Sequence, residues 1–397
     1  MNDTSAEGGP AIAPGHLREI AQLGFAHLVN DIYFPILMAL QPILITTLGY
    51  TYFQAALLPA MHSILSSVLQ PVFGSLADKK GLRVSIAVSL LCSGCGVALL
   101  GLVSDHYLVM LGCVALSALG HATFHPGALC KVGALANTAN RGRLTSLFTV
   151  GGNLGQALGP IIGGLALAYG GINAITWLVI PSIVGVIILL AFPIPESCPV
   201  AAKPAGDGKE NWRPVILLFS GATLRSWVTF GAMTFIPTFL VLNGYPILEA
   251  TMLVSGMLLA GVAGQLTGGA LSDRFGRKHV VVATTLVAVP AFACVLVTHG
   301  ALLVLSLLLF GFFLWASFAV TISMAHELVP SQMGFISGLF MGIAMGAGGI
   351  GVSISGMVAD HFGLTATLAS FPIIVLLAAL LFATVRYPRE EVPRAAG

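Results

Sequence analysis

Twelve apolar runs dominate this sequence and limit what it can fold into. Each run can cross the hydrocarbon layer of a bilayer, about 30 Å thick, which takes about 20 residues of α-helix. Because the backbone polar groups of a chain in lipid must be satisfied internally, the runs predict an all-α polytopic membrane protein. Only 8% of the residues are charged, against about 25% in soluble domains. The predicted spans are 19–47, 51–77, 84–103, 107–130, 143–169, 172–192, 213–242, 248–272, 279–298, 301–326, 334–360 and 364–386.

One long polar linker, rich in Pro and Gly, separates the sixth run from the seventh. It divides the chain into an N-terminal six-helix bundle (1–192), a linker (193–213) and a C-terminal six-helix bundle (214–397). Every Lys and Arg except Arg225 lies in the segments on the linker's side of the membrane. By the positive-inside rule both termini and the linker are cytoplasmic, and we expect a multi-pass protein of the cell (inner) membrane.

The two halves carry an internal repeat. Adding 195 to positions in the first half places Pro42 on Pro237 and Asp78 on Asp273. Repeats on the half-chain scale are typical of transporters, whose substrate site lies near the middle of the membrane where the repeats meet. The repeat therefore predicts two pseudo-symmetric halves and a substrate site between them.

The first run contains an acidic residue at membrane depth. Asp31 lies one helical turn after His27, on the same face of the helix. An ionisable group inside a membrane helix suggests a functional site. The alternative is a protonated residue that serves only helix packing. On the repeat offset, its neighbour Asn30 falls on Arg225, the only basic residue deep inside an apolar run. We expect Asp31 and Arg225 to face one cavity, with Asn30 and Arg225 binding substrate.

Such a pair could couple proton and substrate. Burial disfavours the charged form of a carboxyl group, whereas a nearby Arg favours it. A ligand that engages Arg225 would take away the partner of Asp31, which would then bind a proton more readily, with His27 tuning or relaying that proton. The alternative is a static ion pair that only holds the halves together.

The fourth run places two imidazoles four residues apart, at His121 and His125, directly before Pro126. Two His at this spacing could bind a metal ion, but no carboxylate or Cys accompanies them locally. We therefore expect no metal site, and we interpret both residues as a polar cavity lining or a proton relay, since His titrates near neutrality. No phosphate-binding loop occurs in the sequence, so ATP is not expected as the energy source, and we expect no cofactor.

Three further residues are substrate-binding candidates with structural alternatives. Trp227 and Phe230 lie close to Arg225 in sequence and could bind the apolar part of a ligand, or could serve packing and lipid contact. Gln41 precedes Pro42 and could line the path, or could bond carbonyl groups that Pro leaves free.

Two short loops share a pattern that predicts gating. The first joins the second and third runs and the second joins the eighth and ninth, and both combine Gly, Asp and basic residues. Two copies at equivalent places favour a symmetric gate over a simple positive-inside turn. The gating candidates are Gly74, Asp78, Gly81 and Arg83 in the first copy, and Asp273, Arg274, Gly276 and Arg277 in the second. These loops resemble the loop signature of the major facilitator superfamily, which implies two six-helix halves and loops that brace the outward-facing state.

The fifth run is rich in glycine at spacings that allow close helix packing. Its residues Gly155, Gly159, Pro160, Gly163 and Gly164 resemble the antiporter signature of the same superfamily, which implies outward transport. Together with His27, Asn30, Asp31 and the Phe124-His125-Pro126 segment, they resemble the fosmidomycin-resistance subfamily of drug–proton antiporters.

The resulting prediction is a secondary active transporter that exports a small organic molecule in exchange for protons by alternating access. The substrate would be a drug or a metabolite, and an anionic molecule such as a phosphonate is one candidate. A proton symporter or facilitator for uptake is the alternative within this class, and a membrane-embedded enzyme using His121, His125 and Asp31 is the alternative outside it. The expected partners are the lipid bilayer, the small-molecule substrate and protons, without nucleic acid, and we expect a monomer that is not an enzyme.

Overall fold

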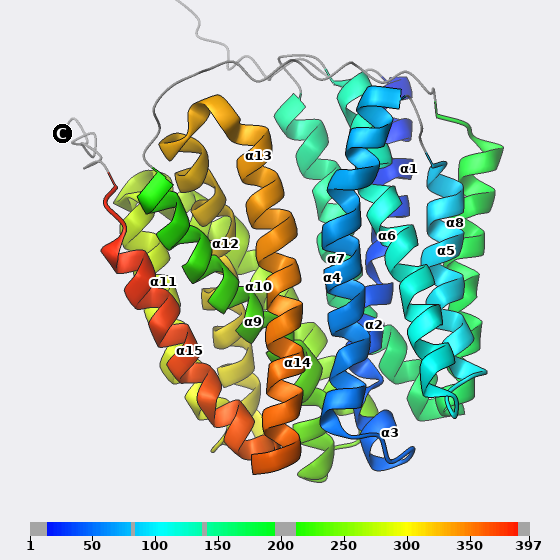
Figure 1. Ribbon diagram of the computed structural model, residues 1–397, viewed down its shortest axis with the longest axis vertical. Helices are drawn as coiled ribbons and strands as arrows, with labels where there is room; N and C mark the ends of the chain where they lie inside the picture. The colour runs from blue at the N-terminus through cyan, green and yellow to red at the C-terminus, as the bar shows by residue number, and fades with distance from the viewer. Residues whose placement is uncertain (1–13, 81–83, 137–140, 195–211, 388–397) are drawn as a thin grey trace, which may run out of the picture.

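The structure, a computed structural model, describes residues 14–80, 84–136, 141–194 and 212–387. Within these residues the chain is helical, without a β-strand, and helices occupy all twelve predicted spans (Figure 1). The first span consists of α1 (Pro14–Asp31), α2 (Tyr33–Ala39) and α3 (Gln41–Thr46). We call residues 14–194 the N-terminal half and residues 212–387 the C-terminal half.

The remaining helices follow in chain order, several of them flanked by short irregular turns. The N-terminal half continues with α4 (Tyr52–Lys80), α5 (Ile86–Ala98) with a 3-10 turn (Leu99–Gly101), α6 (Tyr107–Leu135), α7 (Arg141–Gly170), and a 3-10 helix (Ile172–Leu178) leading into α8 (Val179–Ala191). The C-terminal half contains α9 (Trp212–Leu242), α10 (Ile247–Phe275), α11 (Arg277–Val295), α12 (Gly300–Leu328), a 3-10 turn (Pro330–Gln332), α13 (Met333–Gly338), a π-helical turn (Leu339–Ile343), α14 (Ala344–Phe362) and α15 (Leu364–Thr384).

Ten segments of the described chain, each a single helix or a run of consecutive helices, are long and apolar enough to cross a membrane. The chain is therefore a multi-pass membrane protein. Two predicted spans are not among these ten. One is α5 with its 3-10 turn, which is apolar but short. The other is α7, which includes Gly151, Gly152, Asn153 and Gln156. These polar and small residues lower the hydropathy of α7. Side chains of this kind suit contacts inside the protein better than contact with lipid.

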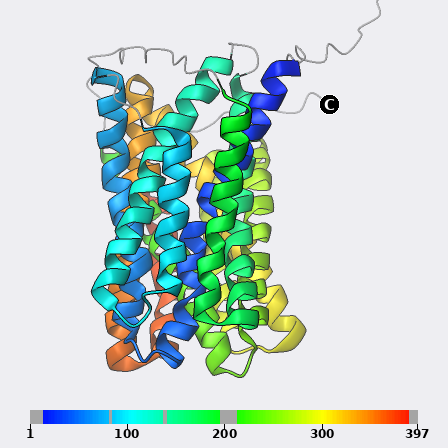
Figure 2. The ribbon, with the colours of Figure 1, turned by 90° about the vertical axis from the view of Figure 1, so that its right-hand side faces the viewer.

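The beginning of α1 and the end of α15 lie at the same end of the bundle, together with the end of α8 and the beginning of α9 (Figures 1 and 2). The first and last described helices, and the two helices that flank the linker in sequence, thus have these ends on one side of the bundle. That this side is cytoplasmic stays a prediction from the positive-inside rule.

One hydrophobic core lies entirely within residues 20–194, and a second lies entirely within residues 215–385. A third cluster joins the two halves, since Phe34, Met38, Ala56 and Ala157 pack with buried residues of the C-terminal half. The division at the linker that the sequence predicts stays a prediction, and these clusters are compatible with it.

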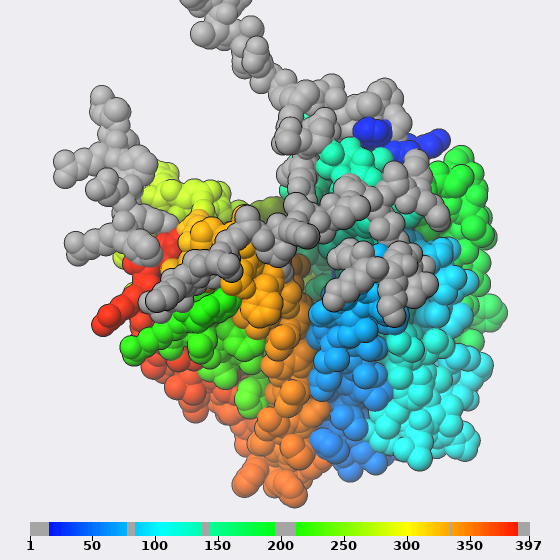
Figure 3. Space-filling view, turned by 45° about the horizontal axis from the view of Figure 1, so that its top comes forward, coloured from blue at the N-terminus to red at the C-terminus, as the bar shows by residue number. Residues whose placement is uncertain are grey.

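The halves meet along α4 and α14, whose contact runs down the middle of the molecule (Figures 1 and 3). Glycines on one face of α14 permit this close approach, because a Cβ atom at Gly349 would lie 3.0 Å from the Cβ atom of Ser63. A Cβ atom at Gly356 would likewise lie 2.9 Å from the Cα atom of Phe53. A second contact between the halves joins α7 to α10, where the Ile161 amide donates to the Ser255 hydroxyl over 3.0 Å.

One end of this interface is closed by a carboxylate. Asp360, near the end of α14, accepts hydrogen bonds from the backbone N–H groups of Tyr52 (2.7 Å) and Phe53 (3.0 Å), in the first turn of α4. This arrangement is a helix N-terminal cap supplied by the opposite half. Two further hydrogen bonds join the halves, from the Ser63 hydroxyl to the Met345 carbonyl and from the Ile161 amide to the Ser255 hydroxyl.

The two predicted gating loops are described unequally. In the first loop, Gly81 and Arg83 and the side chain of Asp78 lie outside the described residues, while Gly74 lies in α4 facing open space. The second loop turns at Gly276, whose φ of 87° favours glycine. Asp273 pairs with Arg277 over 3.5 Å, and Arg277 also pairs with Glu327 of α12 over 2.6 Å. Arg274 lies over the ring of its neighbour Phe275. Both of these ion pairs lie within the C-terminal half.

Candidate functional site

Asp31 lies where the first transmembrane helix is interrupted. It is the last residue of α1, and α2 begins at Tyr33. Pro35 has no N–H group and cannot donate to the carbonyl of Asp31 four residues earlier, which weakens the helix at this point. The interruption places a carboxylate that is only 3% exposed near the middle of the bundle.

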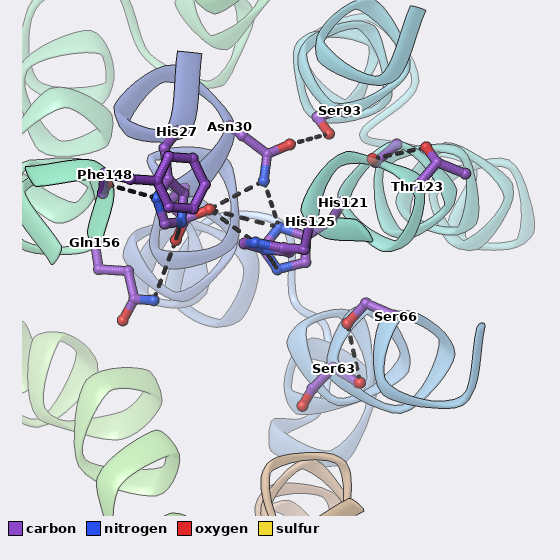
Figure 4. A network of polar contacts seen from close by, with 12 residues as sticks. His27, Asn30, Ser63, Ser66, Ser93, His121, Thr123, His125, Phe148 and Gln156 are labelled. Carbon is purple, nitrogen blue, oxygen red and sulfur yellow. Dashed lines mark hydrogen bonds and ion pairs between the residues drawn. The ribbon is translucent and has the colours of Figure 1, made fainter. Parts of the chain in front are cut away.

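Five polar side chains, all labelled in Figure 4, surround the Asp31 carboxylate, and one of them is His121, whose Nδ1 lies 4.0 Å from Oδ1. Oδ2 lies 3.3 Å from His27 Nε2 and accepts a long hydrogen bond (3.4 Å) from Gln156. Oδ1 accepts a 3.0 Å hydrogen bond from the Asn30 amide and lies 3.7 Å from His125 Nε2. Both oxygens therefore face donors from three different helices, α1, α6 and α7, which is how a buried carboxylate is normally accommodated.

The proton positions on His27 follow from its other contact. His27 Nδ1 lies 2.9 Å from the carbonyl oxygen of Phe148, and because a carbonyl only accepts, Nδ1 carries a proton. The remaining nitrogen, Nε2, points at Asp31. A hydrogen bond between Nε2 and the carboxylate then requires one further proton, held either by the imidazole or by the carboxyl group. A His27–Asp31 hydrogen bond therefore contains one proton in addition to the proton on Nδ1.

A second chain of hydrogen bonds leads from Asn30 to the imidazoles of α6. The Asn30 amide nitrogen also contacts His121 Nδ1 over 3.0 Å, and its oxygen accepts from Ser93 over 2.9 Å. His121 Nε2 lies 3.1 Å from His125 Nε2. Asn30, which the sequence predicts as a substrate ligand, instead orients Asp31 and His121 in this structure.

The glycines of α7 bring this helix against α1 and α2. A Cβ atom at Gly152 would overlap the His27 ring, one at Gly155 would overlap the Leu28 carbonyl, and one at Gly159 would lie 2.6 Å from the Ile32 carbonyl. The smooth face therefore lets α7 supply both Gln156 and the Phe148 carbonyl to the site. Further along α7, Gly163 packs against α2 and Gly164 contacts Thr251 of the opposite half, while Pro160 lies inside the helix.

A cavity lies beside Asp31, between the two halves, with an empty volume of about 460 Å³ that includes space open to solvent. Its polar lining comes from the N-terminal half, and its remaining lining from Phe34 and three residues of the C-terminal half. The lining residues are Asp31, Phe34, His62, Ser63, Ser66, Ser67, Gln70, His121, Gln156, Phe230, Met341 and Met345. Of the predicted site residues, Asp31, His121 and Phe230 line it, while His27, Asn30 and His125 lie behind Asp31 and His121.

The same group offers ligand atoms for a metal ion. Side-chain nitrogen and oxygen atoms of His27, Asp31 and His125 lie within 4.8 Å of one another. The sequence-based expectation of no metal depended on the lack of a nearby carboxylate, and the fold supplies one from α1. We interpret the group as a hydrogen-bonded proton site, because the carboxylate oxygens already accept from Asn30 and Gln156.

Besides Asn30, three predicted substrate ligands do not line the cavity. Arg225 is buried, donates to the Ser317 hydroxyl over 3.2 Å and lies over the Phe318 ring, and no ion pair joins it to Asp31 in the described residues. The expected facing pair of Asp31 and Arg225 is therefore absent from this conformation, because the guanidinium points toward α12. Trp227 donates to Ser355 within the C-terminal half. The Gln41 amide donates hydrogen bonds to the Leu37 and Ala55 carbonyls, which is the structural role predicted as the alternative to lining the path.

The cavity also contains residues that the sequence analysis missed. His62 is only 1% exposed, and Gln156 reaches Asp31 from α7. The signal for His62 was present, since it is an ionisable side chain in the middle of the second apolar run. Gln156 lies inside the glycine-rich segment of α7, where its side chain could not be told from a packing residue.

Comparisons with known proteins agree with this architecture. The family model of the Major Facilitator Superfamily matches residues 23–258 and 218–397. The chain is 32% identical over 377 residues to the uncharacterized MFS-type transporter YfnC of Bacillus subtilis, covering 90% of this chain and 91% of that protein. It is 28% identical to the fosmidomycin resistance protein of Escherichia coli, covering 86% of each chain.

Among solved structures, the chain resembles a bacterial homologue of the human lysosomal transporter Spinster in an inward-facing, occupied conformation. The TM-score is 0.79 at 16% sequence identity, covering 94% of this chain and 97% of that one. This likeness concerns the fold. The family match spans nearly the whole sequence, and the chain belongs to the major facilitator superfamily.

Proposed function

We propose that this transporter exports a small organic molecule in exchange for protons. One observation carries the proposal: a buried carboxylate, which shares a proton site with His27, lies on the wall of a cavity between the two halves. A proton site and a substrate site in contact with each other are what coupled exchange requires.

The exchange follows from the charge of the site. Loss of the shared proton leaves the His27–Asp31 pair with a net negative charge in a low-dielectric interior, which is costly. A substrate that donates hydrogen bonds to Asp31 offsets this cost, so substrate binding and proton release favour each other. In the outward-facing state the reverse occurs, because a proton that binds from outside removes the charge that holds the substrate.

Export is the direction that the resemblances support. The glycine face of α7 resembles the antiporter signature, and the packing of Gly152 and Gly155 against α1 ties this face to the proton site. Relatives include the fosmidomycin resistance protein and, at 25% identity over 64% of this chain, the multidrug resistance protein MdtG of Salmonella. On the predicted orientation, with both termini in the cytoplasm, the Asp360 cap closes the external side and the cavity belongs to an inward-facing state.

Proteoliposomes test this proposal. The assayed compounds are fosmidomycin and every compound to which expression of the protein confers resistance in a growth screen. Antiport predicts that an imposed pH gradient drives these compounds in the direction opposite to proton flow, and that an ionophore which collapses the gradient stops accumulation. Flux that ignores the gradient would indicate a facilitator, flux in the same direction as protons a symporter, and chemical conversion of the compound an enzyme.

A further inference from the structure

His62 of α4 is a buried imidazole without a hydrogen-bond partner. The residue is 1% exposed, and in the described part of the chain neither Nδ1 nor Nε2 has a partner. Buried polar groups are normally bonded, and an unbonded one is destabilising. Because His62 lines the cavity, a molecule in the cavity can supply the missing partner.

The imidazole is held in place by aromatic neighbours. It stacks on Phe34 with ring centroids 5.1 Å apart and an interplanar angle of 22°, and its edge meets the His121 ring at 5.3 Å. These contacts orient the ring without using its nitrogens. The ring is therefore positioned for a ligand in advance, which lowers the entropy cost of binding.

The cavity wall around His62 is polar. Ser63, Ser66, Ser67 and Gln70 follow it along α4, and all of them line the cavity. The Ser63 and Ser66 hydroxyls donate to backbone carbonyls, which leaves their oxygens as acceptors (Figure 4). The C-terminal half faces this wall with Phe230, Met341 and Met345, whose side chains are apolar.

We propose that His62 is a substrate-binding residue that hydrogen-bonds the polar head of the transported molecule. The ligand class is a small amphiphile whose head both donates and accepts hydrogen bonds, because a neutral imidazole offers one donor and one acceptor. The apolar part of the molecule packs on Phe230, Met341 and Met345. The inference depends on the proposed function only in that the transported molecule binds in this cavity.

Equilibrium binding to the purified full-length protein in nanodiscs, without a pH gradient, tests the assignment. The probes are fosmidomycin, whose head is anionic, chloramphenicol, whose head is neutral, and tetraphenylphosphonium, a cation that forms no hydrogen bonds. His62→Phe keeps the ring and its stacking on Phe34 but removes both nitrogens. His62→Gln keeps one donor and one acceptor.

At least one hydrogen-bonding probe should bind the wild type and bind His62→Phe about 10-fold more weakly, the loss expected for one hydrogen bond in a buried site. His62→Gln should recover part of this loss, and tetraphenylphosphonium should not distinguish the variants. Ser117→Ala is the matched control, since Ser117 is also buried with an unbonded oxygen but does not line the cavity. If His62→Phe fails to fold, His62→Leu gives the same comparison.

Equal binding of the hydrogen-bonding probes to wild type and His62→Phe overturns the assignment and makes His62 a packing residue. Failure of both hydrogen-bonding probes to bind the wild type overturns the ligand class. The probe that binds shows whether the cavity accepts a ligand with an anionic head, as in fosmidomycin, or with a neutral head, as in chloramphenicol. The binding assay uses no proton gradient. Loss of binding in His62→Phe would therefore support the role of His62 even if transport proved independent of protons.

Discussion

At the scale of single residues, Gly152 controls the position of His27. A methyl group at Gly152 would overlap the His27 ring, so Gly152→Ala pushes the imidazole away from Asp31. Loss of a hydrogen bond to a charged group costs about 1.5–3 kcal/mol, and we expect gradient-driven transport to fall roughly 10-fold or more. Transport in proteoliposomes under an imposed pH gradient measures this effect.

Gly112→Ala is the control for this variant, because a Cβ atom at Gly112 of α6 meets nothing within 4 Å. It should transport like the wild type and keep the thermal stability of the wild type in detergent. Full gradient-driven transport by Gly152→Ala would mean that the contact between His27 and Asp31 is not needed.

Arg225 leads to a second prediction at this scale. Its guanidinium is buried and donates a hydrogen bond to Ser317, and it has no carboxylate partner among the described residues. Replacing an unpaired buried charge by an apolar side chain of similar length is often neutral or stabilising. Arg225→Met should therefore fold, and it should weaken the binding of anionic fosmidomycin more than that of neutral chloramphenicol. Arg225→Lys, which keeps the charge, should weaken it less, whereas equal effects on both probes would exclude anion binding by Arg225.

Individual site residues could be predicted from the sequence only in part. Asp31, His27, His121 and His125 could be found because ionisable residues stand out in apolar runs, and the fold brings all four together. The direction of a side chain could not be found in this way. The repeat predicts that Arg225 lies on the helix equivalent to that of Asn30, and in the structure its side chain turns toward Ser317.

At the scale of helices, one carboxylate closes one end of the contact between α14 and α4. Asp360→Ala removes the acceptor for the Tyr52 and Phe53 amides, at an exposed site where such a cap is worth roughly 1 kcal/mol. The population with this end open should rise about fivefold. Distances between spin labels at the exposed residues Thr47 and Phe362 measure this population.

Asp105→Ala provides the comparison, since Asp105 is an exposed carboxylate in the loop before α6. It should leave the label distances unchanged. Unchanged distances in Asp360→Ala as well would show that the glycine packing of α14 closes this end by itself.

The presence of each membrane helix could be predicted from the sequence, but the interruptions within the helices could not. Twelve spans could be found from hydropathy, including the short α5 and the polar α7, because the length of each run limits the choice. The interruptions at Ile32 and Leu40 depend on how Pro35 and Pro42 are accommodated by neighbouring helices. The π-helical turn at Leu339–Ile343 had no signal in the sequence.

At the scale of the whole molecule, we expect transport to proceed by rocking of residues 1–192 against residues 213–397. Rocking would open the Asp360 cap, which joins the halves at one side of the molecule, and would bring the halves together at the opposite side. Cysteines at Gly133, near the end of α6, and at Leu328, at the end of α12, should crosslink in the opposite state and block transport. The six native cysteines are replaced first.

Crosslinking of this pair at the same rate with and without substrate, without inhibition, would argue against rocking. A single cysteine at either position, treated with the same reagent, controls for effects of labelling alone.

The central claim is that the proton crosses the membrane on the site formed by Asp31 and His27. The most direct measurement compares wild type and Asp31→Asn in the same proteoliposomes, first for accumulation driven by a pH gradient and then for exchange without a gradient. Asparagine keeps the size of the side chain and one acceptor oxygen but cannot take up the exchanged proton. We predict that Asp31→Asn loses gradient-driven accumulation and retains exchange, whereas accumulation against a gradient with the pH dependence of the wild type would contradict the assignment.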